Sequence, residues 1–402
     1  MTSTDTAPER AIEIRRGTAA DVPAIQAVNA RAFGEEMGPE GRAEGARLTP
    51  GERHVLALQG STVIGVTALM PLRMTVPGGA QVDAAGISNV SVAATHRRRG
   101  VLRQILGAQH RDLLAQGYPL AALTASEGTI YGRFGYGPAT VRRRVEIDRR
   151  GVEVARSAPD PGGVALVGAE TARGLLPALH ERWATRTPGA LRRDETWWDW
   201  QLADRPEDRP GSTSLCFLLH PDGYASYRAH GSRAEVVEVI STTDAAHAAL
   251  WRVLLGLDFA DVLAAPLSPD DPLPFLLTDT RAVRVVGVRD GMWVRPLDVA
   301  AALALRRWAV EIDVVLGITD PFLDRGGRFR LRGGPEGSEC VRTDDAAAVN
   351  LDVATLGALY LGGHRVSTLA RAGLLTGAAP AVLARLELAL LTDRAPENGT
   401  DF

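Results

Sequence analysis

The chain has 402 residues, 45% hydrophobic and 23% charged, and its formal net charge of −3 gives no support to a nucleic-acid partner. A chain of this length is expected to form more than one domain, and two cysteines exclude both a disulfide framework and a thiolate metal site. We find no apolar run of about 18 residues and no signal-peptide pattern, so we expect a cytoplasmic protein without a membrane partner.

The first 150 residues alternate between strand and helix patterns. Residues 11–17 alternate in polarity like a strand, and residues 18–33 predict a helix with Thr18 or Asp21 at its start. Residues 101–117 place apolar side chains at helical spacing and predict a second helix. Short runs rich in apolar and β-branched residues predict the strands, at 54–60, 62–76, 86–96, 119–126 and 139–147.

Two changes of pattern divide the rest of the chain. Proline, glycine and charged residues gather in 148–163, which indicates a boundary. A strand meander followed by a helix at 244–257 then repeats the order of the first block, and from about residue 290 a different order of strands and helices begins. We therefore predict a mixed α/β protein of three domains, at residues 1–150, 151–288 and 289–402.

An arginine-rich loop is the first functional signal. The sequence RRRG (97–100) lies where a predicted strand passes into a helix, and backbone N–H groups at a helix start attract anions. Gly100 leaves room for a close approach, and arginines pair well with phosphates. We expect a pyrophosphate to bind Arg97, Arg98, Arg99, Gly100, Val101 and Leu102. A solvated basic turn is the alternative.

Four stretches together resemble a known family. SNVSVAATHRRRGVL, ASEGTIYGRFGYGPAT, MWVRPLDV and the final Phe402 are similar to the Eis (enhanced intracellular survival) family of GCN5-related N-acetyltransferases (GNAT). The resemblance implies a catalytic GNAT domain that uses acetyl-CoA, a second GNAT-like domain, a sterol-carrier-protein-like α+β domain and a homohexamer. In the second block the loop TDAAHAAL has no arginine or glycine, and Asp244 would repel a pyrophosphate, so we expect no coenzyme A there.

The resemblance also implies roles in catalysis. Tyr131 would be the general acid that protonates the departing thiolate, because a phenol with a pKa near 10 stays protonated at pH 7. The carboxylate of Phe402 would be the base. The pantetheine arm would lie along the backbone of Val90, Ser91 and Val92, with Ser126 close by. A core tyrosine and a frayed terminus are the structural alternatives.

A polyamine acceptor such as an aminoglycoside would favour an acidic, partly aromatic cleft. The candidates for this cleft are Glu35, Glu36, Ser88, Asn89, Thr124, Trp197, Asp298 and Asp401. Asn89 and Thr124 stand where relatives can carry an aromatic residue and a histidine, which predicts a pocket of different shape.

Two other functions stay open at this stage. A wide acidic cleft would also accept lysine side chains of peptides or proteins. A non-catalytic carrier of acyl-CoA or lipid would instead use the third domain, where residues 292–308 could line an apolar tunnel or form core. No H-x-x-H or H-E-x-x-H spacing occurs among the histidines, so we expect no metal.

Overall fold

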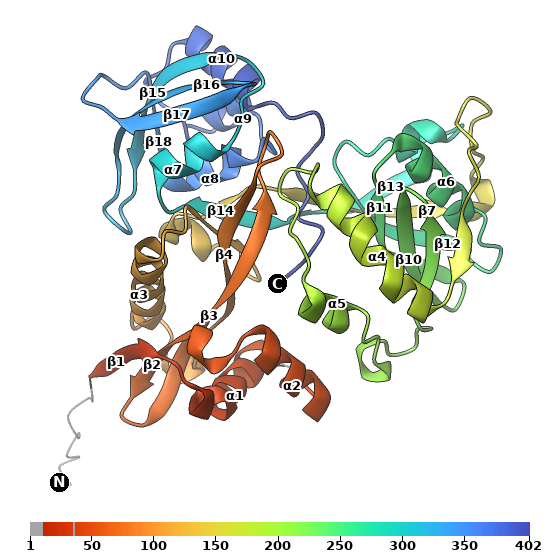
Figure 1. The fold of residues 1–402 in the computed structure, drawn as a ribbon, viewed down its shortest axis with the longest axis horizontal. Coiled ribbons are helices and arrows are strands. Elements are labelled where there is room, and N and C mark those ends of the chain that lie inside the picture. Colours follow the sequence, from red (N-terminus) through yellow and green to blue (C-terminus); the bar gives the residue numbers. More distant parts are fainter. Residues whose placement is uncertain (1–10, 35–36) are drawn as a thin grey trace, which may run out of the picture.

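A computed structural model describes residues 11–34 and 37–402 of the chain. The described residues form three β-sheets with helices packed on them (Figure 1). The first and second sheets each have seven strands, in the orders β1-β2-β3-β4-β5-β14-β6 and β13-β7-β12-β11-β10-β9-β8. The third sheet has four, in the order β17-β16-β15-β18. The described part of the chain thus confirms the mixed α/β architecture predicted from the sequence.

The first sheet carries the glycine-rich and arginine-rich motifs. Its strands are β1 (Ile12–Arg16), β2 (His54–Gln59), β3 (Thr62–Thr75), β4 (Gln81–Val92), β5 (Leu120–Thr124), β14 (Met292–Pro296) and β6 (Gly137–Pro138). Its helices are α1 (Val22–Phe33), α2 (Pro39–Leu48) and α3 (Val101–Ala115). Helix α3 buries Val101, Ile105 and Leu106 in apolar clusters of this domain, as its periodicity predicts.

The second sheet has the same plan in its β-meander and helix. Its strands are β7 (Val141–Asp148), β8 (Ala165–Val167), β9 (Cys216–His220), β10 (Gly223–His230), β11 (Arg233–Ser241), β12 (Val262–Leu267) and β13 (Val283–Asp290). The helices are α4 (Ala169–Ala184), α5 (Glu195–Gln201) and α6 (Asp244–Leu255). At the start of α6 the Thr243 hydroxyl accepts a hydrogen bond from the Ala246 amide, so that side chain caps the helix.

Two strands lie in sheets that the predicted boundaries did not assign to them. Strand β7, expected to end the first domain, pairs with β12 and β13 of the second sheet. Strand β14, expected to open the third domain, pairs with β5 and β6 of the first sheet. The predicted boundaries at 150/151 and 288/289 therefore do not coincide with the limits of the sheets, because an antiparallel partner can lie far along the chain.

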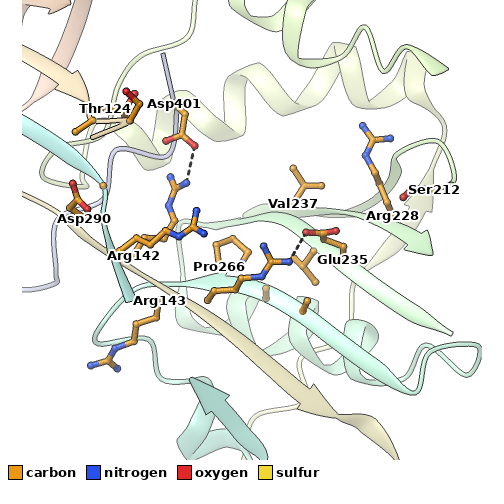
Figure 2. A pocket seen from close by; sticks show the side chains of 18 of the residues that line it. Thr124, Arg142, Arg143, Ser212, Arg228, Glu235, Val237, Pro266, Asp290 and Asp401 are labelled. Carbon is orange, nitrogen blue, oxygen red and sulfur yellow. Dashed lines mark hydrogen bonds and ion pairs between the residues drawn. The ribbon is translucent and has the colours of Figure 1, made fainter. Parts of the chain in front are cut away.

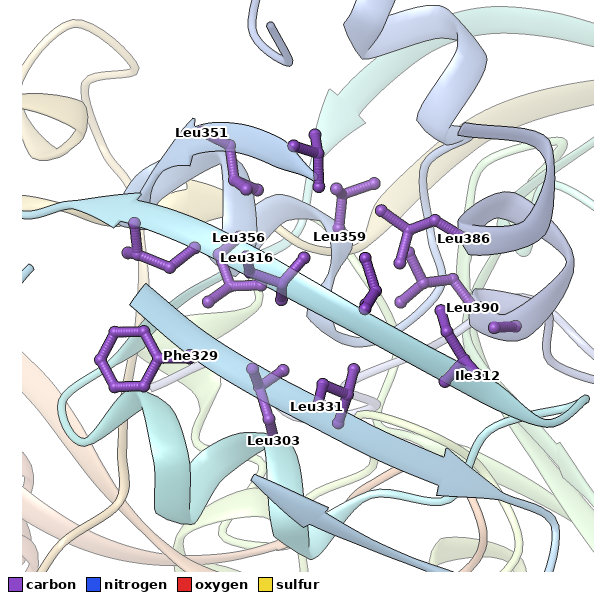
Figure 3. Close-up of a cluster of buried hydrophobic side chains, with 14 of the residues drawn as sticks. Leu303, Ile312, Leu316, Phe329, Leu331, Leu351, Leu356, Leu359, Leu386 and Leu390 are labelled. Atoms are coloured by element: carbon purple, nitrogen blue, oxygen red, sulfur yellow. The ribbon is translucent and has the colours of Figure 1, made fainter. Parts of the chain in front are cut away.

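The third sheet is formed by β15 (Ile312–Thr319), β16 (Gly327–Gly334), β17 (Gly337–Arg342) and β18 (Val349–Asp352). Around it lie α7 (Val299–Leu305), α8 (Val353–Tyr360), α9 (Val366–Arg371) and α10 (Pro380–Leu390). Figure 3 shows the packed leucines, isoleucine and phenylalanine of its core, with Leu303 of α7 among them. Val299 belongs to the same cluster, so core packing explains the apolar face of α7.

The last residues run back from the third domain and end between the other two sheets (Figure 1). The Glu397 amide donates to Pro188 O, and the Leu191 amide donates to Asn398 O. Asn398 and Thr400 are buried. The second domain thus fixes this terminal segment through these bonds.

Candidate active site

The parallel strands β4 and β5, which precede the arginine-rich loop and the glycine-rich stretch, separate from one another toward their C-terminal ends. Strands β4 and β5 pair only at Ala84–Leu120, Ala85–Ala121 and Gly86–Ala122. Beyond Gly86 a bulge shifts the register of β4 against β3, between the pairs Val66–Ser91 and Ala68–Ser88. Asn89 lies in this bulge with a φ of 51°, a left-handed conformation that asparagine tolerates better than most residues.

This separation, which we call the splay, leaves one edge of β4 without a strand partner over its last residues. Val90 and Val92 are half-buried there, and their backbone belongs to the bulged end of the strand. The hydroxyl of Ser91 is buried and donates to Asn29 Oδ1 over 2.7 Å, so this side chain holds α1 against β4. An extended ligand could therefore be bound in the splay by backbone groups of β4, as the sequence predicted.

The arginine-rich loop lies at the end of the splay. Arg98 and Gly100 have φ values of 63° and 79°, and Gly100 is the N-cap of α3. Residues with positive φ among residues with negative φ turn successive backbone N–H groups toward one concave side, where a phosphate can be bound. Space around Gly100 is open, and Arg97, Arg98 and Arg99 are exposed. These residues fit the pyrophosphate of coenzyme A, with Val101 and Leu102 supplying the first turn of the helix.

Two buried tyrosines of the glycine-rich stretch differ in what their hydroxyl groups contact. The Tyr136 hydroxyl lies 2.7 Å from His110 Nε2, and His110 Nδ1 lies 2.5 Å from Leu106 O. Burial lowers the pKa of His110 to about 3, so its ring is neutral, donates from Nδ1 and accepts the Tyr136 proton at Nε2. The Tyr136 hydroxyl is therefore fully used inside the core.

Tyr131 begins the short 3-10 helix η4 (Tyr131–Phe134) and is also buried. Burial raises the pKa of Tyr131, which keeps the phenol protonated at neutral pH. No group in residues 11–34 or 37–402 forms a hydrogen bond with its hydroxyl. Tyr131 therefore has a proton to donate, whereas Tyr136 does not.

The carboxyl group of Phe402 lies at the end of β5. The Thr124 hydroxyl, on the last residue of β5, donates to Phe402 O over 2.8 Å. The Phe402 side chain packs against an apolar cluster that contains Trp197. Arg193 holds the residues just before it: its Nε donates to Thr400 Oγ1 and one Nη donates to Gly399 O. The expectation that Phe402 is ordered near the reaction centre is consistent with these contacts.

The other predicted acceptor residues are spread over the molecule. Ser88 and Asn89 lie on β4, where the Asn89 amide donates to Thr49 Oγ1. Asp298 caps α7 through the Ala301 amide and does not line the cavity described below. Glu35 and Glu36 lie outside the described residues.

A cavity of about 820 Å³ adjoins this site between the first and second sheets. Thr124 and Asp401 line it on one side, with Asp290 of β13 near them, and Glu235, Val237 and Pro266 of β11 and β12 line it on the other (Figure 2). Ser126 also belongs to the lining. The lining contains six arginines, and these outnumber its carboxylates: Arg142, Arg143, Arg144, Arg209, Arg228 and Arg289. The cavity thus differs from the acidic, aromatic cleft that a polyamine acceptor predicts.

Sequence reasoning missed the arginines that organise this region. Arg142 pairs with Asp401 over 2.9 Å, so the predicted ammonium ligand Asp401 already has a cationic partner. Arg193 pairs with Glu238 of β11 and is buried. Arg295 of β14 donates to Phe134 O at the end of η4 and pairs with Asp320 over 2.6 Å. Arg142 follows the glycine-rich stretch by two residues and Arg295 lies within MWVRPLDV, but their partners Asp401 and Asp320 are distant in the sequence and are shown only by the structure.

Two further structural findings concern cofactors and membranes. Within residues 11–34 and 37–402, no group of three or more His, Cys, Asp or Glu side chains is placed to hold a metal ion. Over the same residues no helix has the length and hydrophobicity needed to cross a bilayer.

The comparison with known proteins agrees with this geometry. Residues 13–139 and 189–296 each match the model of an acetyltransferase (GNAT) domain family, and residues 299–397 match that of a sterol carrier protein domain. The chain is therefore a GNAT acetyltransferase with a sterol-carrier-protein-like domain after two GNAT domains.

Its relatives define the family more narrowly. The N-acetyltransferase Eis of Mycobacterium bovis is 42% identical over 396 residues, which cover 95% of this chain and 97% of the relative. An uncharacterised N-acetyltransferase of Streptomyces coelicolor is 39% identical over 349 residues, covering 83% and 84%. The crystal structure of Eis1 from Mycobacterium abscessus superposes with a TM-score of 0.87 at 33% identity, covering 97% and 100%. The chain belongs to the Eis family of N-acetyltransferases.

Proposed function

We propose that this protein transfers the acetyl group of acetyl-CoA to a primary amine of an acceptor bound in the 820 Å³ cavity. One observation carries the proposal: the Phe402 carboxyl group is fixed at the end of β5, on the edge of the splay, while the buried Tyr131 hydroxyl follows a few residues later and has no partner among the described residues. In this proposal the base comes from the C-terminal segment and the acid from the stretch that follows β5.

When bound, acetyl-CoA supplies an acetyl thioester, whose carbonyl carbon is the electrophile. The chain supplies three functions around it. The Phe402 carboxylate accepts a proton from the acceptor ammonium, which leaves a nucleophilic amine. Backbone N–H groups at the bulged end of β4 stabilise negative charge on the carbonyl oxygen. The amine forms the new C–N bond as the C–S bond breaks, and Tyr131 donates its proton to the departing sulfur. The second proton that the nitrogen loses restores the phenol, so the products are an acetamide, free coenzyme A and the proton held by the carboxylate.

The acceptor class is the finer part of the proposal. The family resemblance favours aminoglycoside-like polyamines, acetylated at one or more amines, and the cavity volume suits an acceptor of that size. The arginines of the cavity favour the second class, lysine side chains of peptides, because peptides also carry carboxylates. By resemblance we expect the active form to be a cytoplasmic homohexamer.

The test is release of coenzyme A thiol from acetyl-CoA in the presence of each acceptor class. We expect release that depends on the amine, with the acetylated amine identified by mass spectrometry. Thiol release at the same rate without any amine would mean hydrolysis, and no release with any amine would contradict the proposed transfer. The protein has no lysine of its own, so acetylated lysine in the mixture must come from the added peptide.

A further inference from the structure

Two arginines lie side by side on neighbouring strands that line the cavity. Arg289 of β13 is the direct partner of Arg142 of β7 in the antiparallel ladder. Side chains of directly opposed residues lie on the same face of a sheet, a few ångströms apart. Like charges in such a pair destabilise the sheet unless an anion lies between them. Both residues line the cavity, so this repulsion is located on the face that the acceptor would contact.

The carboxylates of the cavity are already engaged. Asp401 accepts from Arg142, and also from the Asn398 amide over 3.3 Å. Glu235 accepts from Arg144 over 3.2 Å. Asp290 accepts from the indole N–H of Trp293. Each acid of the lining therefore has a donor of its own.

The arginines are not fully compensated by these acids. Arg209 and Arg228 both pair with one carboxylate, that of Asp204. Arg289 is exposed and forms no ion pair or hydrogen bond with residues 11–34 or 37–402. An excess positive charge is thus left on the cavity face of β13, next to the Arg142–Asp401 pair.

We propose that Arg289, together with Arg142, is an anion subsite that selects acceptors bearing a carboxylate or phosphate in addition to the reacting amine. This inference rests on the proposed acetyl transfer and specifies its acceptor. The anionic group binds the guanidinium groups of the second sheet while the amine reaches toward Phe402 on the first sheet. A purely cationic polyamine gains nothing from this subsite and is repelled by it.

The neighbouring Arg143 is a matched control. It also lines the cavity, but it lies on the same strand one residue from Arg142, so its side chain leaves the opposite face of the sheet from the Arg142–Arg289 pair. Figure 2 shows its guanidinium group directed away from Arg142 and Asp401. Replacing Arg143 or Arg289 by glutamine removes one cavity-lining positive charge in each case, but only Arg289→Gln removes the arginine that lies directly opposite Arg142.

The experiment compares acceptors that differ in one charge. Nα-acetyl-lysine has a free carboxylate and its amide does not; O-phosphoethanolamine and ethanolamine are the corresponding pair for a phosphate. We expect kcat/KM to favour the anionic member of at least one pair by about tenfold, as a charge-assisted bond to arginine predicts. Arg289→Gln should abolish most of this preference, and Arg143→Gln should keep it. The pair that shows the preference identifies the anion.

Three outcomes would overturn the subsite: equal kcat/KM within both pairs, an undiminished preference in Arg289→Gln, or an equal loss in Arg143→Gln. Binding separates this failure from failure of the proposed function. Calorimetry with Nα,Nε-diacetyl-lysine and with its amide requires no chemistry. If no amine is acetylated but the carboxylate still binds about tenfold more tightly than the amide, and Arg289→Gln removes that difference, the subsite holds and the acetyl transfer is wrong.

Discussion

At the scale of single residues, Tyr131 and Tyr136 lie five positions apart in the sequence but differ in the hydrogen bonding of their hydroxyl groups. Both are buried and their rings pack edge to face, with centroids 6.2 Å apart. The Tyr136 hydroxyl donates a hydrogen bond to the neutral His110 ring, whereas the Tyr131 hydroxyl has no acceptor among the described residues. The glycine-rich motif therefore contains one structural phenol and one phenol that is free to act on a ligand.

We expect Tyr131→Phe to lower kcat by about 10²–10⁴-fold with little change in the Kd of acetyl-CoA, because it removes a proton donor for the leaving thiolate. Steady-state kinetics and calorimetry measure the two quantities. Tyr136→Phe is the control: it should cost about 1–3 kcal/mol of stability in urea unfolding, since His110 Nε2 loses its donor. Unchanged turnover in Tyr131→Phe would remove this residue from the mechanism.

At the scale of elements, the second domain repeats the splay of the first but uses it differently. Strands β11 and β12 pair only at Arg233–Val262, Ala234–Leu263 and Glu235–Ala264, as β4 and β5 do over three pairs. A cavity of about 260 Å³ lies beyond these pairs, bordered by β11, β12 and residues 396–401. The terminal segment thus lies, in the second domain, at the place equivalent to the splay where the first domain would bind its coenzyme.

Arg193 connects this splay to the terminal segment. Its guanidinium group contacts Glu238 of β11, Gly399 O and Thr400 Oγ1, and it stacks over Trp198 at 5.0 Å. Gly399 has a φ of 64°, and a Cβ there would meet the Trp183 ring at 2.5 Å. The second domain therefore fixes the path of the chain up to Phe402. Although this GNAT domain has no arginine-rich loop, it has a role in positioning the C-terminal residues.

We expect Arg193→Lys to lower kcat by about tenfold or more without changing KM for acetyl-CoA, because lysine cannot reproduce the forked contacts. Steady-state kinetics give this split, and urea unfolding reports the accompanying loss of stability. A second variant, one glycine added after Phe402, keeps every Arg193 contact but displaces the carboxylate. It should lose turnover at unchanged stability. Full activity in the extended protein would refute the carboxylate base.

At the scale of the whole molecule, the pairing of β7 with the second sheet and of β14 with the first shows which features the sequence could predict and which it could not. Local patterns were sufficient for α3 and for the loop at its start, because periodicity and motif residues lie within a few turns of one another, whereas Tyr131 was singled out by the family resemblance. They could not show that β14 enters the first sheet, or that Arg295 from this strand holds the end of η4 while pairing with Asp320. The arginine-lined cavity depends on the same long-range pairings.

The buried histidines predict how the whole molecule responds to acid. Burial lowers the pKa of His110 to about 3 and that of His180 to about 2, whereas each has a value near 6.5 when unfolded. Between about pH 6.5 and 3 the unfolded chain therefore binds more protons than the folded one, and stability falls as the pH falls. Each histidine contributes about 1.4 kcal/mol per pH unit well below pH 6.5.

Urea unfolding at pH 7, 6 and 5 measures this slope. His180→Phe keeps an aromatic ring beside Trp183 and Trp198 but cannot be protonated, so its stability should fall less steeply with acid, by about 1.4 kcal/mol per unit. Burial raises the pKa of Glu397, which opposes the trend. The Arg15 guanidinium beside Asp21 holds the pKa of that carboxyl well below its usual range, so protonation of Asp21 lowers stability only in stronger acid. An identical slope in His180→Phe would mean that this ring is already accessible to protons in the folded protein.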